Sequence, residues 1–436
     1  MSAARDRLGG RLPLLVILAV ALLVRLAVVA GTPDFEPVFD AADYSRHAES
    51  IAAGDGYPGS VVTASQDEPS AFRPPAFPYL LGGVYALTGS SYTAARLLCA
   101  LLGVLTVLLL FMVARRTLGP RAALVAGGIG AVFPPLVFLS ASLTVESLFT
   151  PLALGAVLVL LRHRESASVR SAVAAGALIG AATLARYNGL ALLLPAVLAT
   201  GLGVPRSMRV RAVSAAIVCA AALAVIAPWV VRTSTAFDSP TPLGTQGGYA
   251  LAGVYNSVAR SDPENPGAWR LPNVAPELRG LFSDRSIDER ELDSGLREES
   301  LELMGEHPGY VAEVFARNSW RLANPRAHAE ETSLSYDGMG IPSGWRPLLD
   351  WSWFALLGAS LAGAAAMAAG RARRPPLFIW AVPAVVLGTV AAVAAEPRYR
   401  TAADPFFALA AAALVSRAPT RDGPRAGPTS PPAPAA

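Results

Sequence analysis

The sequence has no lysine, two cysteines and four histidines, and only 16% of its 436 residues are charged. Cys99 and Cys219 lie inside apolar runs, so neither is placed for an extracellular disulfide, and we interpret none of the histidines as a metal ligand. The Walker loop, GxGxxG, HExxH and paired CxxC motifs are also missing. The familiar soluble motifs for nucleotide, zinc and redox chemistry are therefore absent.

Apolar residues make up 53% of the chain, which is more than a soluble domain of this length could bury in one core. Runs long enough to cross a bilayer recur along the sequence. We predict an all-α polytopic membrane protein with about ten transmembrane helices and further helices at the outer interface. The first run is long, contains Arg25 and has no small-residue cleavage site, which favours a retained helix over a signal peptide. The predicted spans are 13–31, 92–114, 121–140, 147–161, 170–185, 189–204, 212–231, 351–370, 376–395 and 402–416.

All 36 basic residues are arginines, and their positions predict the orientation. Ten spans leave six segments on the side of the N-terminus, and each of these holds three arginines. By the positive-inside rule that side is cytoplasmic, so both termini are predicted to lie there. The net charge of +4 then reflects membrane topology and cytoplasmic headgroup contacts rather than nucleic-acid binding.

The predicted organisation follows from these spans. Residues 1–12 form a cytoplasmic N-terminus, and 13–231 contain seven transmembrane helices together with a first outer segment at 32–91. A second outer segment, 232–350, is long enough for a small domain, and 351–416 contain the last three helices. The Pro- and Ala-rich tail, 417–436, is predicted to be disordered.

Within the two outer segments, four stretches have helical or apolar patterns. Ala41–Ala53 and Pro74–Leu87 are predicted interfacial helices, the second of which could instead be re-entrant. Ile287–Met304 and Gly309–Leu322 are predicted amphipathic helices, separated by a break at His307-Pro308-Gly309.

Polar residues interrupt the predicted outer ends of the helices. Acids and arginines thus gather at one depth on one side of the membrane, which is typical of a site for an anionic, lipid-linked substrate at the outer leaflet. The residues concerned are Arg25, Asp40, Asp43, Tyr44, Arg73, Glu146, Arg186, Arg398 and Arg400.

Several stretches resemble a known family when taken in order. They are FDAADYSRHAESIAAGDGY, FRPPAFPYLLGGVYALTG, FPPLVFLSASLTVESLF, APWVVRTSTAF and EPRYRTAADPFFALAAAAL. Their order and spacing resemble the polyprenyl-phosphate-sugar-dependent glycosyltransferases of the GT-C fold. This group includes protein O-mannosyltransferases, in glycosyltransferase family 39, and the lipid A aminoarabinose transferase. The resemblance covers roughly residues 12–416, and the second outer segment beyond Asn256 is hard to match.

The resemblance implies roles for individual residues. Asp40, four residues before Tyr44, matches the family's catalytic base and would have the tyrosine as a substrate contact. The family often has Asp-Glu where this chain has Asp40-Ala41, which leaves Asp43 as a possible substitute. Arg73, followed by two prolines, matches the residue that contacts the donor phosphate, and Glu146 matches a second acid.

The chemistry of such a transfer independently calls for this set of residue types. One general base must take the proton of the acceptor hydroxyl as it attacks C1 of the sugar. The phosphate leaving group needs no acid, but its charge needs stabilisation, which arginine supplies with a planar fork. We therefore expect an inverting glycosyltransferase with several phosphate-binding arginines, namely Arg73, Arg186, Arg398, Arg400 and Arg25.

The expected partners are a polyprenyl-phosphate-linked sugar, an acceptor glycan, lipid or protein, and membrane lipids. No cofactor is expected to be required, and the sequence leaves the need for a divalent metal open.

Simpler interpretations stand beside these roles. Asp40 or Asp43 could cap the interfacial helix, Glu146 could cap the fourth transmembrane helix, and Arg73 could be an interfacial arginine whose head reaches water. Arg25 could pair structurally with an acid.

The alternative function is a transporter or flippase of a lipid-linked glycan, and a third is an inactive scaffold. Transporters place charges near the midplane of repeated halves, whereas here the charges lie at helix ends and no repeat is found.

Overall fold

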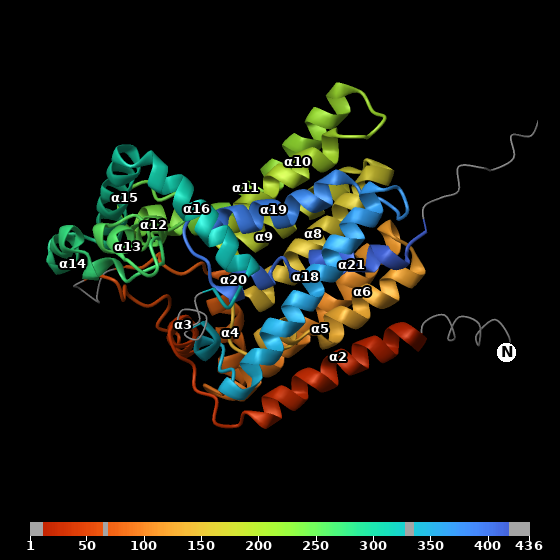
Figure 1. Cartoon of the computed structure of the whole chain (residues 1–436). Helices are drawn as coiled ribbons and strands as arrows, with labels where there is room; N and C mark the ends of the chain where they lie inside the picture. The colour runs from red at the N-terminus through yellow and green to blue at the C-terminus, as the bar shows by residue number, and fades with distance from the viewer. Residues whose placement is uncertain (1–11, 64–68, 328–334, 418–436) are drawn as a thin grey trace, which may run out of the picture.

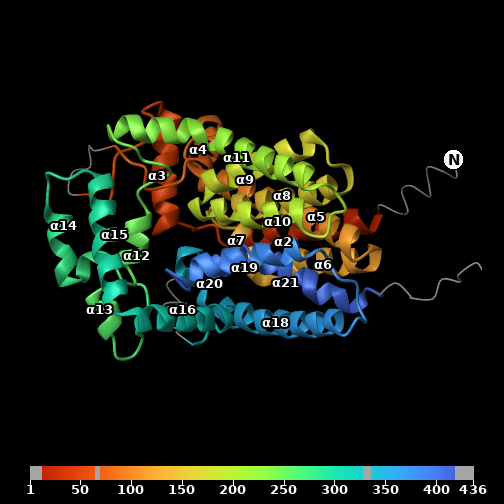
Figure 2. The same ribbon diagram turned by 90° about the horizontal axis from the view of Figure 1, so that it is seen from above.

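The computed structural model describes residues 12–63, 69–327 and 335–417, and every regular element in these ranges is a helix. Long helices pack side by side in a bundle, and a group of shorter helices, α12 to α16, lies at one end of it (Figure 1). The view from above shows α12 to α15 beyond the end of the bundle (Figure 2), whereas α16 packs against α19 (Leu377–Ala391). The all-α fold class predicted from the sequence is confirmed.

The bundle contains the helices that correspond to the predicted spans. Their bounds are α2 Leu12–Gly31, α5 Tyr92–Thr117, α6 Pro120–Val132, α7 Pro134–Ser140, α8 Glu146–Ser166, α9 Val169–Ala185, η1 Tyr187–Leu192, α10 Leu193–Gly201, α11 Met208–Ala236, α18 Arg346–Ala368, α19 Leu377–Ala391, α21 Asp404–Ala412 and η5 Ala413–Val415.

Five helices in the described part of the chain are long and apolar enough to cross a membrane: α2, α5, α8, α11, and α18 with the preceding turn η4 (Ser343–Trp345). The bent pair α6 and α7 makes a sixth if it is one span. Shorter apolar helices occupy the other predicted ranges. The count of ten crossings stays a prediction.

Two predicted spans are interrupted rather than continuous. The expected single helix over 121–140 is broken at Phe133, and α6 and α7 meet there at 56°. Phe133 is extended because a residue before proline is disfavoured in the α region, and Pro134 has no N–H for the helix ladder. The expected span 189–204 likewise begins as the 3₁₀ turn η1 and becomes α-helical only at Leu193.

Close packing of α9 against α11 depends on small residues. Gly176 and Gly180, four residues apart, present one face of α9 to the backbone of α11. A Cβ atom on Gly180 would lie 2.7 Å from the carbonyl oxygen of Ala222, which is closer than real contacts allow. The glycines thus let the two helices approach as small-xxx-small pairs do in membranes.

The first predicted outer segment forms two helices next to the bundle. They are α3 (Asp40–Ala53) and α4 (Ala76–Thr88), at the positions expected for the interfacial helices. The aromatic rings of Tyr44 on α3 and Phe77 on α4 meet edge to face, with centroids 5.2 Å apart. This packing places the start of α3 beside the segment that leads into α4.

The second predicted outer segment folds into the α12–α16 group. Its elements are α12 Gly247–Ala252, α13 Ser257–Ser261, η2 Pro272–Val274, η3 Pro276–Leu278, α14 Arg279–Ser283, α15 Glu289–Glu306 and α16 Pro308–Ala323. The two amphipathic helices predicted here are confirmed as α15 and α16. Asp288 and Glu291 form a capping box at the start of α15, and α15 gives way to α16 at His307-Pro308, where the break was predicted.

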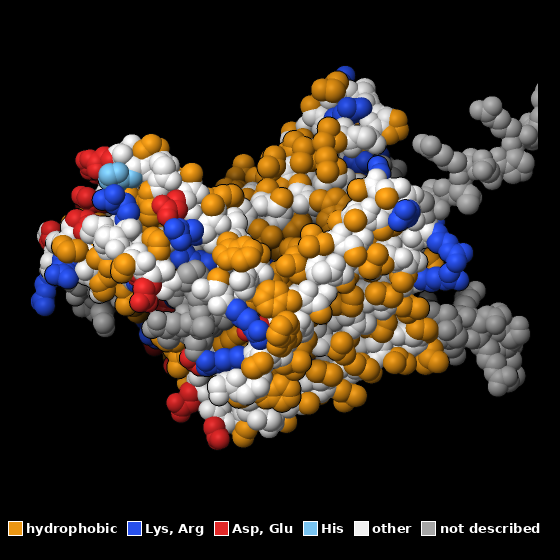
Figure 3. Space-filling view, in the orientation of Figure 1, with side chains coloured by type: hydrophobic (Ala, Val, Ile, Leu, Met, Phe, Trp, Pro, Cys, Tyr) orange, Lys and Arg blue, Asp and Glu red, His pale blue; other side chains and the backbone are white. Residues whose placement is uncertain are grey.

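Charge is distributed unevenly over the molecule. Acidic side chains are seen only over the end that carries α12–α16 and below it, whereas arginines are seen at both ends of the molecule (Figure 3). Hydrophobic side chains cover much of the surface between (Figure 3). The end away from α12–α16 therefore shows basic but no acidic side chains in this view, and which side of the membrane is cytoplasmic stays a prediction.

Candidate functional site

Two carboxylates from α3 and two guanidinium groups form the centre of the candidate site, which we call the Asp40 cluster (Asp40, Asp43, Arg73 and Arg398). Arg73 donates from Nη2 to Oδ1 of Asp40 at 2.7 Å and from Nε to Oδ2 of Asp43 at 2.6 Å. Arg398, which lies on the short helix α20 (Pro397–Thr401), donates from Nη2 to Oδ2 of Asp40. Asp40 therefore lies between two arginines that are 325 residues apart in the sequence (398 minus 73).

The capping interpretation of the two aspartates does not hold. Asp40 is the first residue of α3, and no side chain makes a cap hydrogen bond there. Phe39, just before it, has a positive φ of 51°, which is uncommon for a residue other than glycine. The local backbone turns sharply, and the Asp40 carboxylate pairs with arginine instead of with the helix N–H groups.

Electrostatics keeps both aspartates ionised. Burial would raise the pKa of Asp40, but Arg73 and Arg398 outweigh it and hold that pKa well below its ordinary value. For Asp43, burial is likewise outweighed by His47 and Arg73, and its pKa is also lowered. Each aspartate is therefore a carboxylate near neutral pH.

The environment of Arg73 shows that it is not an interfacial arginine reaching for water. Its side chain is 9% exposed, and its Cζ lies 5.1 Å from the ring centroids of both Tyr44 and Phe72. Two aromatic faces and two carboxylates thus hold the guanidinium in one orientation. In this structure Tyr44 supports Arg73.

A second acid–arginine pair is linked to the cluster through one tyrosine. Glu146, the first residue of α8, accepts a hydrogen bond from Arg186, and no side chain makes a cap hydrogen bond at that helix start. The guanidinium of Arg186 lies 4.8 Å from the ring centroid of Tyr399, and that of Arg398 lies 4.7 Å from the same centroid. Arg398 also donates to the Tyr399 hydroxyl at 2.7 Å. The two pairs therefore form one continuous polar region.

Two predicted phosphate-binding arginines have other partners. Arg25 is buried in the bundle and donates to Ser140 Oγ at 2.7 Å and to the carbonyl oxygens of Ala21 and Ala131 at 2.9 and 3.1 Å. Arg400 donates to the Leu322 carbonyl at 3.1 Å and lies over the ring of Trp353. Within the described part of the chain, the hydrogen-bond and ion-pair partners of Arg25 and Arg400 lie outside the Asp40 cluster. Backbone and hydroxyl oxygens accept these hydrogen bonds of Arg25, where an acid was one possible partner.

Three residues at the site were not predicted individually. His47 lies one helical turn after Asp43 on α3, with Nδ1 3.3 Å from Oδ1 of Asp43. Glu396 approaches Arg398 at 3.0 Å, and burial raises the pKa of its carboxyl. Tyr399 lies on α20 directly after Arg398. Helical spacing could have indicated His47, and adjacency to Arg398 could have indicated the other two.

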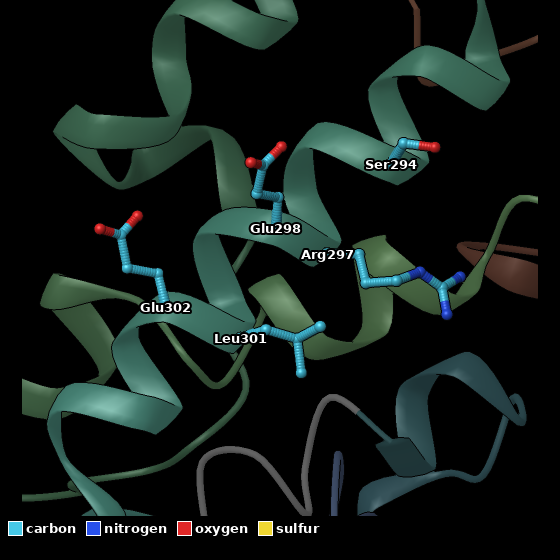
Figure 4. A pocket seen from close by; sticks show the side chains of 5 residues that line it. All are labelled: Ser294, Arg297, Glu298, Leu301 and Glu302. Atoms are coloured by element: carbon cyan, nitrogen blue, oxygen red, sulfur yellow. The ribbon is translucent and has the colours of Figure 1, made fainter.

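No group of three or more His, Cys, Asp or Glu side chains within 12–63, 69–327 and 335–417 is arranged to hold a metal ion. Two hollows lie away from the cluster. One, of about 640 Å³, is on the surface of α15, where Ser294, Arg297, Glu298, Leu301 and Glu302 line it (Figure 4). The other, of about 490 Å³, is mostly apolar and lies between α18, α19 and α21. Neither is lined by a residue of the Asp40 cluster.

Comparison with known proteins bears on the fold. The sequence model of the dolichyl-phosphate-mannose-protein mannosyltransferase family matches residues 72–231, a range that includes Arg73, Glu146 and Arg186. The structure of the oligosaccharyltransferase AglB from Archaeoglobus fulgidus, in complex with an inhibitory peptide and a dolichol-phosphate, superposes with a TM-score of 0.51 at 16% identity. The fold is that of the GT-C glycosyltransferases.

The extent of these similarities differs. The AglB match covers 91% of this chain but 49% of AglB, so the chain spans about half the length of that protein. ArnT from Cupriavidus metallidurans, bound to undecaprenyl phosphate, matches 92% of this chain and 76% of its own at 18% identity, with a TM-score of 0.44. No curated protein has significant sequence similarity to the chain.

Proposed function

We propose that this protein is an inverting membrane glycosyltransferase that moves a sugar from a polyprenyl-phosphate donor to an acceptor hydroxyl on the outer face of the cell membrane. The observation that supports it most is the Asp40 carboxylate held between the guanidinium groups of Arg73 and Arg398. The reaction calls for one base beside a cationic site for phosphate, and the Asp40 cluster contains both.

The proposed step is a single displacement at C1 of the sugar. The acceptor oxygen forms a bond to C1 while the bond from C1 to the phosphate oxygen breaks. Asp40 takes the acceptor proton, and the electron pair of the broken bond stays on the phosphate, whose added charge Arg73 and Arg398 stabilise. Attack from the side opposite the phosphate inverts the configuration at C1.

Accessibility favours Asp40 over Asp43 as the base. The side chain of Asp40 is 28% exposed, whereas that of Asp43 is 12% exposed. Asp43 is also contacted by Arg46 at 3.2 Å and by His47, in addition to Arg73. An acceptor hydroxyl can therefore reach Asp40 more readily, and Asp43 serves to hold Arg73.

Donor binding would also adjust the basicity of Asp40. While two guanidinium groups donate to it, the lowered pKa makes Asp40 a weak base. A phosphate bound to Arg73 and Arg398 would take some of their N–H donors and offset their positive charge. The pKa of Asp40 would then rise, and its strength as a base would increase only when the donor is in place.

The neighbouring pair Glu146 and Arg186 extends the proposed phosphate site. Arg186 shares the ring of Tyr399 with Arg398, so a phosphate on one guanidinium lies near the other. Glu146 would orient Arg186 through its hydrogen bond. The phosphate leaves without a general acid, so the residues of the chain suffice in this proposal, and no cofactor is included. The acceptor would be a glycan, a lipid or a protein.

A transfer assay tests the proposal. Membranes containing the protein would be incubated with radiolabelled polyprenyl-phosphate sugars, and the label would be followed into lipid, glycan and protein fractions. We expect one donor to label one fraction with wild-type protein and far less label with Asp40→Asn. If no donor transfers its label, or if the variant transfers as well as the wild type, the proposed activity is wrong.

A further inference from the structure

The segment that carries Arg73, from Ser70 to Arg73, is held by contacts from several distant elements. The Tyr57 hydroxyl donates to the Arg73 carbonyl at 2.5 Å, and the Tyr187 hydroxyl donates to the Ala71 carbonyl at 2.8 Å. Arg232, at the end of α11, donates to the Ser70 carbonyl. The backbone leading to Arg73 is therefore fixed on the side of the bundle by partners that the Asp40 cluster does not include.

On its other side, this segment is bound by a single carboxylate from the α12–α16 group. Glu289 accepts from the Ala71 N–H at 2.8 Å and from the Ser70 hydroxyl at 2.9 Å. It also accepts from the hydroxyl of Thr245, which lies just before α12. The Glu289 side chain thus connects α15 with Thr245 and with the segment that carries Arg73. Ala71 and Glu289 are 218 residues apart in the sequence.

The surroundings of Glu289 suit a buried carboxylate. The residue is 1% exposed and is the first residue of α15, between Asp288 and Glu291, which form the capping box. Its charge is stabilised by three hydrogen-bond donors and by the positive end of the α15 dipole. Replacing the side chain would leave the Ala71 N–H without its partner in a buried place, so the segment would shift to find another.

We propose that Glu289 is a positioning residue that sets Arg73 for the donor phosphate and thereby couples the α12–α16 group to the site. This inference rests on the proposed function, because it takes Arg73 to bind phosphate. Glu289 does not contact Arg73 itself. It binds Ser70 and Ala71, and the backbone from Ala71 to Arg73, which the hydroxyls of Tyr57 and Tyr187 also hold, carries the effect to the guanidinium. A shift of about 1 Å in such a group is enough to weaken an oriented contact severely.

A double-mutant cycle on the full chain separates positioning from general stability. The measurement is the Kd for a polyprenyl phosphate without sugar, bound to purified protein in detergent. Glu289→Ala should weaken binding about tenfold when Arg73 is present. In an Arg73→Ala background the same change should have less than about a twofold effect, because the group it positions is gone.

Two further variants sharpen the test. Glu289→Gln should lose less than about threefold, because its amide oxygen can still accept from Ala71 N–H and its amide nitrogen can donate to Ser70 Oγ. If Glu289→Ala does not fold, Ser70→Ala removes one donor from the other side of the contact and is expected to show a smaller loss with the same dependence on Arg73.

Glu277→Ala is the matched control. Glu277 accepts from Ser257 N–H at 2.6 Å and from Ser257 Oγ at 2.7 Å, so its contacts lie entirely within the α12–α16 group. This variant should bind polyprenyl phosphate as the wild type does.

Each outcome decides between the two proposals. Equal losses in both backgrounds, or no loss for Glu289→Ala, would overturn the positioning role while leaving the proposed function intact. Losses in Glu277→Ala as large as those in Glu289→Ala would also overturn it, since any damage to the α12–α16 group would then suffice. Absence of binding by the wild type, or full binding by Arg73→Ala, would overturn the role of Arg73 in the proposed function and this inference with it.

Discussion

Asp40→Asn is the most direct perturbation of the proposed mechanism. Asparagine keeps the size of the side chain and can still accept from one guanidinium through its amide oxygen, but it cannot take a proton at neutral pH. Its amide N–H₂ would face either Arg73 or Arg398, so one charge-assisted hydrogen bond is lost. The Asp40 side chain is 28% exposed, but those of Arg73 and Arg398 are only 9% and 12% exposed, so the lost hydrogen bond should lower the free energy of unfolding by about 1–3 kcal/mol.

The expected kinetic effect falls on chemistry rather than on donor binding. Loss of the base should lower kcat on the order of 10²–10⁴-fold. Donor affinity should be unchanged or somewhat higher, because the substitution removes a negative charge that competes with phosphate for Arg73 and Arg398. A lower kcat without a higher KM is the pattern of an interaction used in the transition state.

The assay compares Asp40→Asn with Asp43→Asn at matched expression, measuring turnover of the same labelled donor and, separately, the Kd for polyprenyl phosphate.

The pH dependence of kcat/KM of the wild type adds a check. Because the pKa of Asp40 is lowered in the free protein, kcat/KM should not fall through protonation of Asp40 as the pH drops from 7 to 5. The ion pairs of Asp40 should likewise stabilise the fold above the unfolded-state pKa of about 4 and lose that effect as the pH falls below it.

Specific results would refute this reasoning. A fully active Asp40→Asn beside an inactive Asp43→Asn would assign the base to Asp43. Full activity of both variants would show that neither carboxylate acts as a base. An Asp40→Asn variant whose entire defect is a raised Kd for polyprenyl phosphate would show that Asp40 organises the arginines instead of accepting a proton.

Three other expectations concern the donor site, the packing and the topology. Arg73→Ala should raise the donor KM with a smaller effect on kcat. Arg73→Lys should restore the donor KM only in part, because a point charge lacks the planar fork of arginine. An unchanged KM in Arg73→Ala would show that Arg73 does not bind the donor phosphate. Gly180→Val should destabilise the protein by about 1–3 kcal/mol in detergent unfolding because its Cβ would press on α11, whereas Gly128→Ala, with open space around it, should have a Tm close to that of the wild type. In intact cells a membrane-impermeant maleimide should label Ser294→Cys, on exposed α15, but not Ser166→Cys at the end of α8, and the reverse result would invert the predicted orientation.

Much of the architecture was predictable from the sequence by itself. Hydropathy located the helices of the bundle because apolar length is a local property. The sequence also indicated the interfacial helix α3, whose apolar residues follow helical spacing, and the break between α15 and α16, where His307 precedes a proline. The order of the motifs also indicated Asp40 and Arg73.

The tertiary structure decided which charges meet. Asp40 and Arg398 are 358 residues apart, and only the packing of α20 against the rest of the bundle brings them together. Of two arginines in one short helix, Arg398 turns to the cluster and Arg400 to Leu322 and Trp353, because neighbouring side chains on a helix point in different directions. No sequence motif indicates the buried carboxylate of Glu289, because its hydrogen-bond partners come from segments remote in sequence. Residue type and spacing can specify the chemistry of a site, but the pairing of its charges depends on how the helices pack.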